Sequence, residues 1–169
     1  MEIDRTKNYQ GIPPYTNPVW KSVYDGVSLE MHIVDHCNLN CAGCNHFSPL
    51  AEPWYIDLDD FRDQITFAYK KIPNIKLFMI LGGEPTLHPK LFELCQIARE
   101  VFPKDKVEIK ILSNGCHLQD AFKHEKEYRD MGIIFDITTY GKYTDHKAVE
   151  YLDSHGLGFN HNSRLFMRQ

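Results

Sequence analysis

The chain lacks the features that mark several large classes of protein. Its 19 basic residues form no basic block and are outnumbered by 23 acidic residues, which gives a net charge of −4. Binding to a nucleic-acid backbone depends on clustered lysine and arginine, so nucleic acid is not an expected partner. No apolar run has the length of a transmembrane helix, and the N-terminal MEIDRTKNYQ lacks the basic-then-apolar pattern of a signal peptide. We therefore expect a cytoplasmic protein with no membrane partner.

Cysteine is scarce and odd in number, with five residues in a chain of 169. Because cytosolic thiols are kept reduced, these cysteines indicate metal-binding or structural thiols rather than a disulfide framework. An apolar share of 43% with 25% charged residues is typical of a globular domain. The length suffices to bury one hydrophobic core.

The first part of the chain differs from the rest in its pattern. Residues 1–27 contain GIPPYTNP and the turn signal Asp25-Gly26, which disfavour a long helix. We expect an irregular N-terminal arm over residues 1–27 and one folded domain over residues 28–169.

Apolar and amphipathic segments alternate from residue 28 onward. Strands are predicted over 28–35, 75–81, 107–112 and 133–140, with a candidate fifth strand over 157–161. Helices are predicted from the N-cap Asp57 to Pro73, over 91–102, up to Gly132, and near 144–155. This alternation implies right-handed parallel βαβ units. The near-continuous apolar run IKLFMIL is typical of a strand buried on both faces of a sheet.

Unusual residues follow four consecutive predicted strands. Cys37–Cys44 follow the first, Gly82–Pro85 the second, Ser113–Gly115 the third and Thr138–Gly141 the fourth. In parallel barrels and open α/β sheets, functional groups lie at the carboxyl ends of the strands. The sequence therefore predicts a single site assembled from these four segments.

The three cysteines of HCNLNCAGCNHF are candidate metal ligands. Cys37, Cys41 and Cys44 can each bind one iron of a cubane cluster, which leaves the fourth iron without a protein ligand. The spacing differs from the bacterial ferredoxin run, and the next cysteine, Cys95, lies 51 positions further on. Zinc is the main alternative, because His46 would complete a Cys3His set. Three buried thiols without metal are the third interpretation.

The CNLNCAGC loop, followed by GGEP, LSNG and a polar end to the fourth strand, resembles the radical S-adenosylmethionine (radical SAM) superfamily. The resemblance runs from about Ser28 to about Asn160. It implies a [4Fe-4S] cluster on the three cysteines, with S-adenosylmethionine (SAM) on the open iron. It also implies an enzyme that reductively cleaves SAM to a 5′-deoxyadenosyl radical, which abstracts hydrogen from an unknown substrate. The electron would come from a reductant such as flavodoxin or ferredoxin.

The resemblance also implies the residues that contact SAM: Gly82, Gly83, Glu84, Ser113, Asn114 and Thr138. Ser113 and Asn114 can alternatively cap the following segment. The superfamily often has an aromatic residue where Gly43 stands, so the adenine needs another contact, for which Phe47 is a candidate. Cys95 and Cys116 are expected to be structural thiols, and His88 a turn residue.

The expected fold class is α/β, a partial parallel (β/α) barrel with about four βα units and a candidate fifth strand. It is incomplete relative to the six-strand core of the superfamily, and such a barrel exposes a strand edge and an apolar interior. Three explanations compete: a naturally short protein, a truncated one, or one completed by self-association or a partner. Two alternatives to an active enzyme stay open, a non-catalytic remnant that binds cluster or SAM, and a zinc-stabilised Cys3His binding module.

Overall fold

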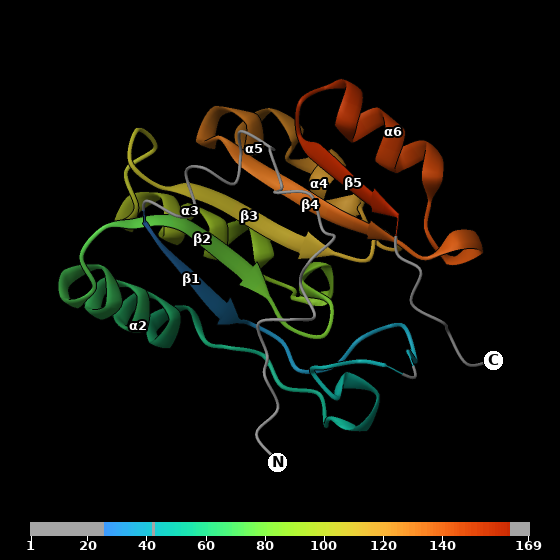
Figure 1. Ribbon diagram of the computed structural model, residues 1–169, viewed down its shortest axis with the longest axis horizontal. Coiled ribbons are helices and arrows are strands. Elements are labelled where there is room, and N and C mark those ends of the chain that lie inside the picture. The colour runs from blue at the N-terminus through green and yellow to red at the C-terminus, as the bar shows by residue number, and fades with distance from the viewer. Residues whose placement is uncertain (1–25, 42, 163–169) are drawn as a thin grey trace, which may run out of the picture.

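The computed structural model describes residues 26–41 and 43–162, and the predicted N-terminal arm lies almost wholly outside them. Five strands form one parallel sheet in the order β1-β2-β3-β4-β5. Their bounds are β1 Val27–His32, β2 Ile75–Leu81, β3 Glu108–Ser113, β4 Ile133–Thr139 and β5 Gly158–Asn162. The sheet is open and all its strands point the same way (Figure 1). The α/β prediction is confirmed, including its fifth strand.

The helices connect successive strands and lie on one face of the sheet (Figure 1). They are α2 Leu58–Lys71, α3 Leu91–Val101, α4 Gln119–Lys123, α5 Glu125–Met131 and α6 His146–Ser154, with the 3₁₀ turns η2 Ser48–Leu50, η3 Pro85–Leu87 and η4 Gly141–Tyr143. Two short helices, α4 and α5, stand where one was predicted, and they meet at His124. No helix in the described part of the chain is both long and apolar enough for a membrane crossing.

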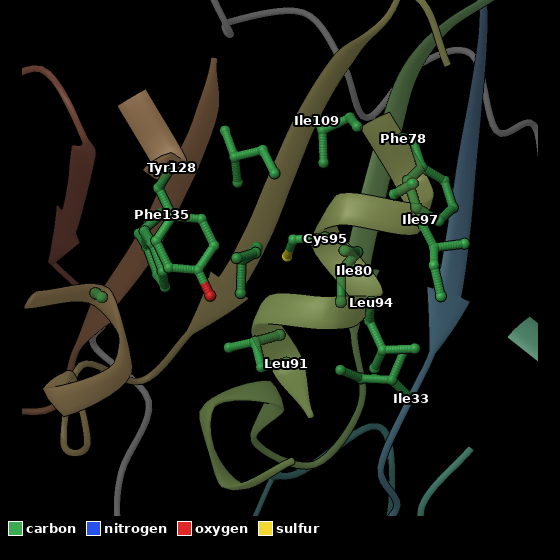
Figure 2. Close-up of a cluster of buried hydrophobic side chains, with 14 of the residues drawn as sticks. Ile33, Phe78, Ile80, Leu91, Leu94, Cys95, Ile97, Ile109, Tyr128 and Phe135 are labelled. Atoms are coloured by element: carbon green, nitrogen blue, oxygen red, sulfur yellow. The ribbon is translucent and has the colours of Figure 1, made fainter. Parts of the chain in front are cut away.

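The hydrophobic core lies between the sheet and these helices. Phe78, Ile109 and Phe135 of the three central strands are fully buried, and α3 covers them with Leu94 and Cys95 (Figure 2). The prediction that Cys95 is a core thiol is confirmed. Burial raises the pKa of Cys95 far above the usual value of a thiol, so it stays protonated and unreactive.

The opposite face of the sheet is less buried and more polar than predicted. Leu77 and Met79 of β2 are only half-buried, so the prediction that this strand is buried on both faces was wrong. The reason is that the five strands do not close, and no helix in the described residues covers this face. Lys110 lies here between Glu108, at 3.4 Å, and Asp136, at 3.6 Å, which makes the face charged as well as apolar.

The loop that carries the cysteines is closed at its base by backbone pairing. Val34 forms an antiparallel bridge with Tyr55. The Asp35 N–H donates to the Trp54 carbonyl at 3.3 Å, and the Ile56 N–H donates to the Ile33 carbonyl at 3.0 Å. The two ends of the loop therefore lie side by side, just beyond the carboxyl end of β1 (Figure 1).

The N-cap of α2 offers a direct test of this fold. The Asp57 carboxylate accepts a hydrogen bond from the Asp59 N–H at 2.8 Å, as an N-cap should. We predict that Asp57→Ala lowers the free energy of unfolding by about 1 kcal/mol, measured by urea denaturation. Asp59→Ala is the matched control, because it removes an acidic side chain from the same turn but keeps the capped N–H. Equal losses in both variants would contradict the capping role.

Candidate functional site

A cavity of about 170 Å³ lies at the carboxyl ends of β1, β2, β3 and β4. Its lining includes every residue that the sequence assigned to the cluster or to SAM: Cys37, Cys41, Cys44, Gly82, Gly83, Glu84, Ser113, Asn114 and Thr138. Apolar side chains that the sequence did not single out complete the wall, namely Leu39, Leu81 and Leu112. The four segments thus meet as predicted, because parallel strands bring their carboxyl ends to one edge of the sheet.

The three thiols of the cysteine loop line one side of this cavity. The Cys44 N–H donates to the Cys41 carbonyl at 3.2 Å, which turns the loop between these two cysteines. Cys37 Sγ accepts hydrogen bonds from the Leu39 N–H at 3.3 Å and from Asn114 Nδ2 at 3.5 Å. Burial raises the pKa of both Cys37 and Cys41, while the hydrogen bonds to Cys37 oppose the shift. Among the described residues, no group of three or more His, Cys, Asp or Glu side chains is arranged so that it could hold a single metal ion.

The glycine pair after β2 holds the start of the cysteine loop. The Gly83 N–H donates to the Val34 carbonyl at 2.8 Å, and the Glu84 N–H donates to the His36 carbonyl at 3.0 Å. A Cβ on Gly82 would lie 2.2 Å from the Val34 oxygen, and one on Gly83 would lie 2.0 Å from the His36 oxygen. The missing side chains therefore allow a close approach of the chain's own backbone just before the first cysteine.

The Glu84 carboxylate joins the ends of β2 and β3. It is 1% exposed and accepts four hydrogen bonds. Oε1 accepts from the Thr86 N–H, from Thr86 Oγ1 and from Ser113 Oγ, at 3.1, 2.7 and 2.8 Å, and Oε2 accepts from the Asn114 N–H at 2.7 Å. Burial raises the pKa of Glu84, and the four hydrogen bonds oppose that shift. The carboxylate is thus already satisfied largely by the chain's own donors.

The polar residues after β3 shape the turn that follows. Ser113 Oγ accepts from the N–H two residues later at 3.0 Å, and Asn114 Oδ1 accepts from the Cys116 N–H at 2.9 Å. Both side chains therefore make the local capping bonds that the sequence left as an alternative. Thr144, which sequence reasoning missed, donates to the Asn114 carbonyl at 3.0 Å and accepts from the Tyr140 N–H at 2.8 Å. No motif marks Thr144, since its partners come from other strand ends.

Two residues reach the cavity from the end of β4. Thr138 and Tyr140 both line it and are half-buried. Phe47, the candidate adenine contact, is 70% exposed and is not part of the lining. Cys116 is half-buried outside the lining, and burial raises its pKa to about 11. These placements give Thr138 direct access to the cavity and deny it to Phe47 and Cys116.

The histidines near the site have different surroundings. His46 lines the cavity, and its ring packs edge-on against His32 with centroids 4.7 Å apart. His88 is 4% exposed, with Nε2 3.1 Å from the Ile56 carbonyl and Nδ1 3.1 Å from the Lys90 N–H. Since a carbonyl accepts and an N–H donates, Nε2 carries the proton and the ring is neutral. Burial lowers the pKa of His88, which favours this neutral form, and His88 is the C-cap residue of η3.

Three thiols, a glycine pair and an acidic residue thus lie together at neighbouring strand ends, and a comparison with known families identifies the class of protein. The model of the radical SAM superfamily matches residues 31–156, well over half of the chain. This protein belongs to the radical SAM superfamily.

Two curated relatives and one solved structure are similar to the chain. It is 24% identical to the 7,8-dihydro-6-hydroxymethylpterin dimethyltransferase of Methanocaldococcus jannaschii over 160 residues, which cover 92% of this chain and 30% of the relative. It is 32% identical to the S-adenosylmethionine-dependent nucleotide dehydratase of a Thermoplasmatales archaeon over 100 residues, which cover 59% of this chain and 33% of the relative. The structure of BtrN in complex with AdoMet and 2-DOIA superposes with a TM-score of 0.57 and 18% identity, and covers 80% of this chain and 56% of BtrN.

The chain spans about a third of the length of the curated relatives. The BtrN superposition supports the α/β partial barrel fold. Members of the superfamily are enzymes that use SAM and a [4Fe-4S] cluster.

The backbone contact at Gly83 yields a prediction for stability. Gly83→Ala should lower the free energy of unfolding by about 2 kcal/mol or more, because its Cβ would meet the His36 carbonyl at 2.0 Å. Gly156→Ala is the control, because no atom lies within 4 Å of its Cβ position. The control should cost only about 1 kcal/mol, from its φ of +71°. A Gly83→Ala variant as stable as the control, by thermal or urea unfolding, would contradict this packing.

Proposed function

We propose that the chain holds a [4Fe-4S] cluster on Cys37, Cys41 and Cys44, binds SAM in the adjoining cavity and cleaves it reductively to start radical chemistry. One observation carries the proposal: the three thiols and the segment Gly82–Glu84 line the same cavity of about 170 Å³. Membership of the radical SAM superfamily supports it.

The residues present fit such a cluster. The three thiols lie on one short loop, and in a cubane each thiolate binds a different iron, so the sulfurs need not converge on one point. The other cysteines do not compete in the described structure, because Cys95 is fully buried in the core and Cys116 is outside the lining. When bound and reduced, such a cluster would supply the electron for cleavage of the SAM sulfonium bond, which in the superfamily gives methionine and a 5′-deoxyadenosyl radical.

The proposed roles of the SAM-binding residues follow from what each side chain already contacts. Thr138 lines the cavity, and no hydrogen bond of its hydroxyl is found within the described residues. Because the superfamily often has a serine that contacts the ribose at this position, we assign the Thr138 hydroxyl to the ribose. Gly82 and Gly83 offer backbone atoms to the methionine moiety. Ser113 and Asn114 contribute mainly by holding the wall, because their side chains are engaged within the chain.

The proposal stops at hydrogen abstraction from an unspecified substrate. A pterin, a nucleotide and 2-DOIA appear in the names of the three similar proteins, so the likeness favours no single substrate. We propose a small cytosolic electron carrier, such as flavodoxin or ferredoxin, as the reductant. The edge strands β1 and β5 are where a second copy or a partner would complete the barrel.

Anaerobic reconstitution with iron and sulfide tests the proposal. The wild-type protein should take up about four irons and four sulfides per chain. After reduction it should release 5′-deoxyadenosine from SAM. Cys41→Ala should lose most of its iron and all of this product. Cys95→Ala is the matched control and should keep both, since Cys95 lies in the core away from the cavity.

Other outcomes would identify the alternatives. A cluster that yields no 5′-deoxyadenosine would indicate the non-catalytic remnant. Stoichiometric zinc that is lost in His46→Ala would indicate a Cys3His module and would overturn the proposal.

A further inference from the structure

Asn114 is bonded at every polar atom and is only 7% exposed. Its N–H donates to Glu84 Oε2 at 2.7 Å, and its carbonyl accepts from Thr144 Oγ1 at 3.0 Å. Its side-chain Oδ1 accepts from the Cys116 N–H at 2.9 Å. The residue is therefore held from three directions: by Glu84 in the turn after β2, by Thr144 at the end of η4, and by its own turn.

These contacts decide which way the side-chain amide points. The Cys116 N–H can only donate, so the atom that faces it must be Oδ1. The NH₂ group then faces the cysteine loop, where Nδ2 lies 3.5 Å from Cys37 Sγ and 2.7 Å from Asn38 Oδ1. The two hydrogens of one NH₂ group suffice for both acceptors.

We propose that Asn114 is a positioning residue that keeps an N–H on the Cys37 sulfur and thereby raises the reduction potential of the cluster. The inference rests on the proposed function, since it requires a cluster on Cys37. Hydrogen bonds to cluster sulfurs help to set the potential. A donor draws negative charge from the thiolate, and this favours the reduced cluster, which carries one more electron.

The structure fixes both ends of this hydrogen bond to the same segment. Glu84 holds the Asn114 backbone through its carboxylate. The N–H groups of Gly83 and Glu84 hold the carbonyls of Val34 and His36, just before the first cysteine. The donor and the segment that leads to the sulfur are therefore both hydrogen-bonded to Gly83 and Glu84. The Leu39 N–H, at 3.3 Å, is a second donor to the same sulfur and survives any change at Asn114.

The test is a redox titration of the reconstituted full chain, followed by electron paramagnetic resonance. Asn114→Ser removes the donor to Cys37 but keeps the turn, because a serine hydroxyl can accept from the Cys116 N–H. Asn114→Ala removes both contacts. Asn40→Ala is the control, since Asn40 is an exposed asparagine of the same loop. Iron content and far-ultraviolet circular dichroism are measured for each variant.

Both Asn114 variants should show a more negative midpoint potential by a similar amount, and Asn40→Ala should match the wild type. We expect the ratio of reduced to oxidised cluster at a fixed potential to fall about tenfold, which is about 59 mV for a one-electron couple.

Three results would overturn the inference. The first is an Asn114→Ser variant with the wild-type potential, even if Asn114→Ala shifts, because the turn would then be the cause. The second is an Asn114→Ser variant that folds but loses its cluster, because Asn114 would then retain the cluster rather than tune it. The third, a wild-type chain that forms no cluster, would also refute the proposed function, whereas the first two leave that function standing.

Discussion

The site depends on one buried carboxylate. Burying a charged group without partners is strongly unfavourable, so Glu84 requires the four hydrogen bonds that it receives. Their donors come from the turn after β2 and from the end of β3, and the register of these two strands ends earlier, at the pair Ile80 and Ile111. The cost of burying the charge is offset only when these segments lie in their native positions. Glu84 thereby fixes the wall on which the cysteine loop rests.

The backbone of the same segment fixes the loop itself. The contacts of Gly83 and Glu84 with Val34 and His36 extend the pairing of β1 and β2 past the last residues of the strands. The three cysteines follow directly, on a loop whose far end is bridged back at Tyr55. The short sequence GGE thus has two structural roles. Its glycines allow the backbone before Cys37 to approach closely, and its glutamate accepts hydrogen bonds from the end of β3. The proposed contacts to SAM would come from the atoms of the lining residues that these hydrogen bonds leave accessible in the cavity.

The sequence predicted the order of elements well, because hydrophobic periodicity is a local signal. The helix predicted over 91–102 forms as α3, and Cys95, predicted to be a structural thiol, is fully buried on it. Prediction failed where the outcome depends on distant segments. IKLFMIL is apolar on both faces, yet Leu77 and Met79 stay half-buried because the sheet is open. The division into α4 and α5 at His124 also has no Gly or Pro to mark it.

The candidate site shows the same limit. All nine predicted residues line one cavity, as expected for residues at the carboxyl ends of neighbouring parallel strands. Spacing alone could not show that Glu84 is satisfied by Ser113 and Asn114, or that Thr144 links the third and fourth strand ends, because these bonds depend on the three-dimensional distances between loops.

The most direct test of the account is the electron paramagnetic resonance spectrum of the reduced, reconstituted protein with and without SAM. The account predicts a [4Fe-4S]⁺ signal that changes on addition of SAM, because SAM would bind the iron that the three cysteines leave open. A cluster signal that is indifferent to saturating SAM would contradict the central claim that this cavity joins the cluster to its cofactor.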